Sequence, residues 1–222
     1  MTSTYQITKP IRLGVEVYDV LLKNLMSLEI KPEERISVDK LSRQLGVSQT
    51  PIREALSQLE IQGLVVKVHL SGYRAAPQLT RKQFDDICEL RLLIEPTAAA
   101  KAAVLMPEQE LSEIAKLAAD MEEPALTDPR SAYNAFAQDD ARFHAAIAKA
   151  SQNDLFHNII TQQRVHLHLF RLRFYAQVTK DAVVEHAGIL EAFHRRDPDA
   201  AGKAMRTHIE NAHARFKNVY DV

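Results

Sequence analysis

The feature that most constrains the fold of this chain lies between residues 37 and 64, where two short amphipathic segments flank a glycine. The first segment carries apolar residues at helical spacing, namely Val38, Leu41 and Leu45. It ends at Gly46, a residue that readily turns the chain sharply. The second segment begins after Ser48 and has Pro51 in its first turn, where the missing N–H costs nothing. The pattern predicts two short helices packed across a tight turn, which is a helix-turn-helix.

Two neighbouring patterns favour a winged helix-turn-helix over an ordinary pair of packed helices. The residues after Gly63 are rich in valine and reach a turn at Gly72, which predicts a small β-hairpin, or wing. Residues 12–28 carry apolar side chains at helical spacing and supply a third helix. We therefore predict that residues 1–77 form a DNA-binding domain of three helices with a small β-hairpin wing.

The outward face of the second helix in such a motif enters the major groove of DNA. Arg53 is the strongest candidate reader, because a guanidinium can donate two hydrogen bonds to guanine or bind phosphate. The full set of predicted DNA contacts is Arg43, Ser48, Gln49, Thr50, Arg53, Ser57, His69 and Gly72.

The charge of the predicted DNA-binding domain is small. Residues 1–77 hold 10 Lys and Arg against 8 Asp and Glu, a net +2, and residues 78–222 hold 18 against 21, a net −3. Phosphate contacts supply much of the affinity for DNA, so a weakly charged domain gains from acting in two copies. We expect a homodimer on a pseudo-palindromic operator in double-stranded DNA.

Length and composition limit the other possibilities. A chain of 222 residues allows two modest domains. No apolar run approaches the roughly 18 residues of a membrane span, and the first residues lack the apolar stretch of a signal peptide. We expect a cytoplasmic protein with no membrane partner. The single cysteine, Cys88, excludes an intramolecular disulfide.

Residues 78–222 predict a second domain that is an all-α six-helix bundle. Thr80 and Gln83 have the spacing of a capping box, and later Pro, Asp and Asn residues mark further helix starts. The expected helices cover residues 80–105, 107–121, 129–151, 153–178, 180–196 and 198–218. Pro96 is expected to kink or interrupt the first of them, because proline removes a backbone hydrogen bond.

Four residues on three of these helices form a candidate metal site. Asp140 and His144 are one helical turn apart and can grip a single ion, and His186 and His208 each share a face with apolar residues. A buried carboxylate needs a cation or several donors, and this ligand set suits Zn, Ni, Mn or Fe. The spacing leaves open the alternative that the histidines are ordinary hydrogen-bonded core residues.

Arg91 and Glu95 lie on a predicted apolar face beside Phe84 and Cys88. An arginine in such surroundings requires a carboxylate, which can be that of Glu95 or that of a ligand. A divalent metal held by one aspartate and three neutral histidines keeps a net charge of +1. We therefore expect a small carboxylate effector at this place, with Arg91 and Glu95 as candidate effector-binding residues.

The chain resembles a known family of regulators. GVSQTPIREALSQLEIQGL is similar to the winged helix-turn-helix of the GntR family. ELRLLIEP, DDARFHAAI, EHAGIL and MRTHIE are similar to the FCD effector domain of its FadR-type branch. The resemblance implies that Asp140, His144, His186 and His208 hold a divalent metal and that Arg91 meets a ligand carboxylate. The family commonly has arginine where this chain has Gln49.

These patterns predict a transcriptional regulator, with repression as the expected sign, whose operator binding responds to a small organic acid. One alternative is a metal-dependent hydrolase or isomerase with an accessory winged domain, because such ligands also suit catalysis. No nucleophile elbow, phosphate loop or cofactor motif supports that alternative. A third interpretation makes the metal purely structural and leaves the helical domain to dimerisation.

Overall fold

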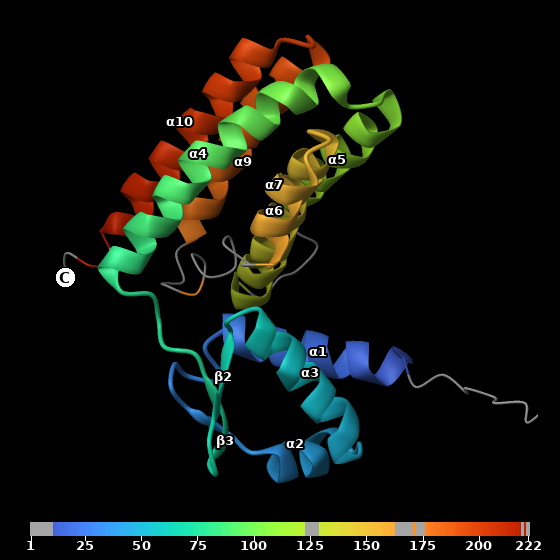
Figure 1. Ribbon diagram of the computed structural model, residues 1–222, viewed down its shortest axis with the longest axis vertical. Helices are drawn as coiled ribbons and strands as arrows, with labels where there is room; N and C mark the ends of the chain where they lie inside the picture. Colours follow the sequence, from blue (N-terminus) through green and yellow to red (C-terminus); the bar gives the residue numbers. More distant parts are fainter. Residues whose placement is uncertain (1–10, 123–128, 163–170, 172–175, 219, 221–222) are drawn as a thin grey trace, which may run out of the picture. The chain divides into compact units, whose positions relative to one another are not determined.

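The structure is a computed structural model that describes residues 11–122, 129–162, 171, 176–218 and 220. The chain divides into two compact units, Met1–Pro77 and Gln78–Val222 (Figure 1). Each unit is described by itself.

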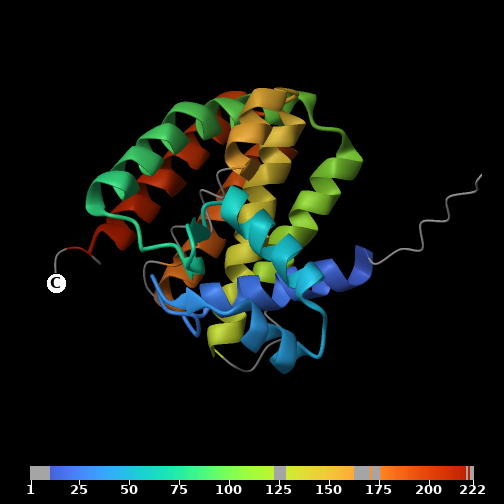
Figure 2. The same cartoon turned by 60° about the horizontal axis from the view of Figure 1, so that its bottom comes forward.

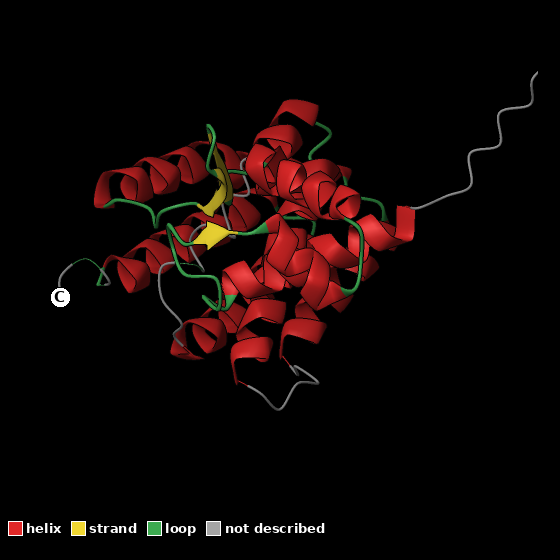
Figure 3. Ribbon diagram, turned by 90° about the horizontal axis from the view of Figure 1, so that it is seen from below, coloured by secondary structure: helices red, strands yellow, loops and turns green. Residues whose placement is uncertain are grey.

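The first unit is a winged helix-turn-helix. Its elements are α1 (Ile11–Met26), β1 (Arg35–Ile36), α2 (Val38–Leu45), α3 (Gln49–Ile61), β2 (Val65–Val68) and β3 (Gly72–Ala75). The three strands form an antiparallel sheet in the order β1-β3-β2, drawn in yellow in Figure 3. The wing is therefore a three-stranded sheet, because β1 adds a strand to the predicted hairpin. Two residues are too short a run for strand periodicity to be visible in the sequence.

Local signals set the ends of the two motif helices. The Ser37 hydroxyl accepts a hydrogen bond from the Lys40 amide and caps α2, which ends at Gly46 in the left-handed conformation with φ 67°. Ser48 occupies the N-cap position of α3, but its side chain makes no capping hydrogen bond. The apolar face of α3 packs on α1, and the buried residues of the pair include Leu21, Leu25, Ile52, Ala55, Leu56 and Leu59.

The described residues of the second unit form helices and the turns between them, with no strand among them. Its helices are α4 (Arg81–Leu105), α5 (Glu108–Glu122), α6 (Pro129–Ala150), α7 (Asp154–Gln162), α9 (Ala176–His194) and α10 (Pro198–Lys217). No described helix of either unit combines the length and apolar character that crossing a membrane requires.

One predicted helix boundary needs correction, and another lies in part outside the described residues. The helix expected over residues 153–178 is described as α7 only to Gln162, and residues 163–170 and 172–175 lie outside the described residues. The predicted break before residue 180 is wrong, because α9 already begins at Ala176. No glycine or proline stands near residue 180 to end a helix there.

The helices α4 and α10 lie side by side along most of their length (Figure 1). The capping box of Thr80 and Gln83 begins α4, which then continues without interruption past Pro96 to Leu105. The predicted interruption is therefore wrong. A Cβ atom placed on Gly202 would stand 3.2 Å from the carbonyl oxygen of Pro96. This close packing of α10 supports α4 where proline removes a backbone hydrogen bond.

Candidate metal centre and nucleic-acid interface

The side chains predicted to contact DNA are exposed on the first unit, whose helices α2 and α3 come forward in Figure 2. Thr50, Arg53 and Ser57 follow one another at helical spacing on α3. His69 and Gly72 lie in and beside the wing turn, where Gly72 has φ 84°. The exposed set is Arg43, Ser48, Gln49, Thr50, Arg53, Ser57, His69 and Gly72.

Gln49 is held between two charged side chains on this surface. Its Nε2 donates to Asp39 Oδ1 at 2.6 Å, and its Oε1 accepts from Arg53 Nη2 at 3.3 Å. The negative charge on one side and the positive charge on the other fix which end of the amide faces which neighbour. Sequence reasoning missed Asp39, because its contact with Gln49 depends on how α2 and α3 meet.

The four predicted metal ligands come together inside the second unit. Asp140 and His144 lie on α6, His186 on α9 and His208 on α10, and all four are buried. One ligand atom from each lies within 4.8 Å of the others. His186 Nε2 is 3.3 Å and His144 Nε2 is 3.9 Å from Asp140 Oδ1. Three imidazoles and a carboxylate thus converge on one point.

His208 is oriented by a carboxylate outside the predicted set. Glu185 Oε2 accepts from His208 Nδ1 at 2.8 Å, and Glu185 is also held by two nitrogens of Arg215 at 2.6 and 2.9 Å and by Asn211. Burial alone would raise the pKa of Glu185, but the hydrogen bonds from Arg215 and His208 lower it to about 2. Burial lowers the pKa of His208 to about 3, so His208 is neutral near pH 7 and turns Nε2 toward the cluster.

His144 has a similar neighbour on its other side. His144 Nδ1 lies 2.5 Å from Glu95 Oε2, while Glu95 Oε1 accepts from Arg91 Nε at 2.6 Å. The Glu95 and Arg91 side chains are each only 3% exposed. Glu95 therefore joins Arg91 to His144. The carboxylate that Arg91 requires is supplied within the protein, and Glu95 itself faces protein groups.

A divalent cation fits this donor set. Nδ1 of His186 makes no hydrogen bond with any described residue, and Nε2 faces Asp140 without hydrogen-bond geometry although both atoms are buried. The His186 ring stacks on Phe143 with centroids 4.4 Å apart, which fixes its plane. Buried polar atoms without hydrogen bonds are costly, and coordination of a cation by Nε2 would remove part of that cost.

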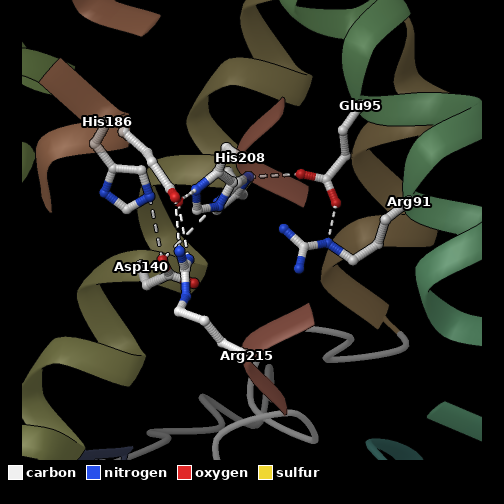
Figure 4. A network of polar contacts seen from close by, with 8 residues as sticks. Arg91, Glu95, Asp140, His186, His208 and Arg215 are labelled. Atoms are coloured by element: carbon white, nitrogen blue, oxygen red, sulfur yellow. Dashed lines mark hydrogen bonds and ion pairs between the residues drawn. The ribbon is translucent and has the colours of Figure 1, made fainter. Parts of the chain in front are cut away.

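Arg91 directs the rest of its guanidinium toward the same cluster (Figure 4). Its Nη2 is buried and makes no hydrogen bond with any described residue. Burial alone would lower the pKa of Arg91, but the negative charges of Glu95 and Asp140 raise it. A charged donor thus faces the place where the four ligand atoms meet.

Sequence reasoning missed Glu185, Asn211 and Arg215 as partners of this cluster. Asn211 and Arg215 follow His208 by three and seven residues, so the three side chains share one face of α10. This spacing is a signal in the sequence that could have indicated Asn211 and Arg215. Their common contact with Glu185 on α9 depends on the relative rotation of the two helices.

Comparison with known proteins places both units in described families. Residues 13–74 match the family model of bacterial regulatory proteins, gntR family, and residues 86–211 match that of the FCD domain. The chain is 25% identical to an uncharacterized HTH-type transcriptional regulator, YdhC, of Bacillus subtilis strain 168, over 98% of this chain and 96% of that protein. It is 29% identical to a putative L-lactate dehydrogenase operon regulatory protein of Escherichia coli K12, over 95% of this chain and 89% of that protein.

The fold agrees with these matches. The solved structure of McbR/YncC from E. coli is similar with a TM-score of 0.73 and 19% identity, over 97% of this chain and 100% of that one. The relatives are transcriptional regulators, so the hydrolase or isomerase alternative is wrong. The FCD match alone covers more than half of the chain. This chain therefore belongs to the GntR family of bacterial transcriptional regulators, in the group that carries an FCD domain.

Proposed function

We propose that this regulator is a repressor that binds a pseudo-palindromic operator as a homodimer, and that its FCD domain holds a divalent metal and a small carboxylate effector. The observation that carries the proposal is the buried convergence of Asp140, His144, His186 and His208 with the guanidinium of Arg91 facing them.

The charges of the cluster favour an anionic ligand. Arg91 with Glu95 and Arg215 with Glu185 form two ion pairs that cancel, which leaves Asp140 as a formal −1 when the histidines are neutral. The metal, when bound, supplies two positive charges and an electrophilic centre. The site as a whole then carries +1, and a carboxylate placed beside Arg91 neutralises it.

The DNA side of the proposal rests on α3 and the wing. Arg53 and Thr50 lie on the exposed face that enters the major groove in this motif. A single domain of net charge +2 gains little from phosphate contacts. Two domains bound to two half-sites double the number of DNA contacts and so raise the affinity for DNA, which supports the homodimer.

A small organic acid agrees with the name of one relative. The E. coli protein is named as a putative regulator of an L-lactate dehydrogenase operon, and L-lactate is a small carboxylate. We therefore place L-lactate among the first acids to be tested on this chain.

The test is a thermal-unfolding screen of the metal-loaded protein against small carboxylates, each paired with its neutral amide. A ligand that binds only the folded state raises the unfolding temperature, and at 100 times its Kd it adds about 2.7 kcal/mol of stability. We expect at least one acid, but not its amide, to stabilise the protein and to change operator affinity in a mobility-shift titration. A panel in which no acid has either effect would contradict the effector proposal and favour a purely structural metal.

A further inference from the structure

Two chains of contacts of the same composition flank the histidine cluster. One runs from Arg91 through Glu95 to His144, and the other runs from Arg215 through Glu185 to His208. Glu185 accepts a hydrogen bond from His208 Nδ1, and Glu95 Oε2 lies 2.5 Å from His144 Nδ1. Each carboxylate is itself held by an arginine. Figure 4 shows Arg91 and Arg215 approaching the cluster from different sides.

The two arginines differ in how much of their guanidinium is engaged. Arg215 places both Nη1 and Nη2 on Glu185 in a bidentate pair, and its buried Nε makes no hydrogen bond with any described residue. Arg91 reaches Glu95 through Nε, and its buried Nη2 makes no hydrogen bond with any described residue. Both terminal nitrogens of Arg215 are therefore engaged by its carboxylate, whereas Arg91 keeps a terminal nitrogen, Nη2, directed at the cluster.

We propose that Glu95 is a positioning residue that couples carboxylate binding at Arg91 to metal binding at His144, whereas Glu185 only orients His208. The proposal rests on the proposed function of the site and names its regulation. The metal would then take part in the response to the carboxylate effector, and would not be merely a structural support.

The coupling follows from the sharing of one carboxylate between two donors. In the structure Glu95 accepts from Arg91 Nε and faces His144 Nδ1, so its negative charge is divided between them. A second anion on Arg91 reduces the pull of that guanidinium on Glu95. Glu95 then becomes a stronger acceptor for the His144 N–H, which makes His144 Nε2 a better electron donor. Thermodynamic linkage requires the metal to strengthen carboxylate binding by the same factor.

Glutamine at position 95 removes this sharing while keeping the size of the side chain. Arg91 and His144 face different oxygens of Glu95, and an amide has only one oxygen, so Glu95→Gln cannot offer an acceptor at both places. If the glutamine nitrogen faces His144, it donates a hydrogen bond to Nδ1, and the ring proton then sits on Nε2. Histidine in that tautomer cannot bind a cation through Nε2. Glu185→Gln is the matched control, because it makes the same change beside His208 and Arg215, away from the free donor of Arg91.

The experiment is a titration of the metal-free full-length protein with Co²⁺, followed by its visible absorption, with and without saturating acetate. In the wild type we expect acetate to raise Co²⁺ affinity about 5-fold or more, within the usual range of coupling between sites. Both glutamine variants should bind Co²⁺ about 10- to 100-fold more weakly. Acetate should no longer raise the affinity of Glu95→Gln but should still raise that of Glu185→Gln.

A second variant tests the same coupling in case Glu95→Gln does not fold. Arg91→Lys keeps a positive charge beside Glu95 but lacks the forked donors, so it should lose the acetate effect. An acetate effect retained in Glu95→Gln or in Arg91→Lys, or lost in Glu185→Gln, would overturn the coupling role of Glu95. A wild-type protein that binds no Co²⁺ would instead overturn the proposed metal site itself.

Discussion

Among single residues, Arg53 is the side chain whose loss we expect to weaken DNA binding most. It is exposed on α3, and its guanidinium is already directed by Gln49. Arg53→Ala should weaken operator binding by about 1–3 kcal/mol, as for a lost base or phosphate contact. Fluorescence anisotropy with operator DNA measures this, and Arg206→Ala, at an exposed position in the FCD domain, is the matched control. Equal operator affinities of the two variants would show that Arg53 does not contact the DNA.

His208 should make the stability of the metal-free protein depend on pH. Burial lowers its folded pKa to about 3 from the ordinary value of 6.5. Between these values the unfolded chain binds a proton that the folded chain does not, so the free energy of unfolding falls as the pH is lowered below 6.5. The slope from this group is at most about 1.4 kcal/mol per pH unit.

Urea unfolding of the metal-free protein at several pH values between 4 and 7 tests this pH dependence, with His208→Gln for comparison. We expect the wild type to lose more stability than the variant as the pH falls. Parallel curves for the two proteins would show that His208 titrates normally in the folded state.

The residues of the metal cluster could be chosen from the sequence, whereas the residues that orient them could not. Asp140 and His144 are four residues apart on one helix, and His186 and His208 stand among apolar neighbours, so local pattern made all four candidates and the family resemblance implied them as ligands. Glu185 meets His208 across two helices, and Glu95 meets His144 in the same way. Such contacts depend on helix rotation, which no local pattern encodes.

The elements α4 and α10 form the packing that supports one side of the cluster, since Arg91 and Glu95 lie on α4 and His208 on α10. Gly202 is a point of close approach, because a Cβ there would stand 3.2 Å from the Pro96 carbonyl oxygen. Gly202→Val should separate the helices and destabilise the protein by about 1–3 kcal/mol.

The matched control for Gly202 is Gly188 on α9, where an added Cβ meets no atom within 4 Å. Gly188→Ala should stabilise the protein by about 0.5–1 kcal/mol, because alanine loses less backbone entropy in a helix. Thermal unfolding measures both variants. A Gly202→Val protein as stable as the wild type would show that α10 does not depend on this close contact.

Most elements could be predicted because their signals are local. The capping box of Thr80 and Gln83, the left-handed Gly46 and the Asp197 cap are all present at the ends of helices. Two of the failures, at Pro96 and at β1, share a physical cause, which is packing from elsewhere in the chain. Pro96 does not interrupt α4 because α10 packs against it, and β1 exists because β3 offers it hydrogen-bonding partners.

For the whole molecule, ligand control requires the effector to bind two states of the regulator with different affinity. The helix that carries His208 also contacts the first residues of the second unit. Tyr220, just beyond α10, donates a hydrogen bond to the Leu79 carbonyl at 2.9 Å, and His213 Nε2 lies 2.7 Å from Asp85 Oδ1. The histidine cluster and the residues that follow Pro77 are thus joined through one helix.

The central claim is that the buried cluster of the FCD domain binds a divalent metal, and the most direct measurement is the metal content of the protein purified without chelators. We predict one transition-metal ion per wild-type chain by elemental analysis and much less in His144→Ala, with nearly unchanged operator affinity. His194→Ala, at an exposed histidine on α9, should keep the wild-type content. A wild-type protein without stoichiometric metal, or a His144→Ala protein with as much metal as the wild type, would contradict the claim.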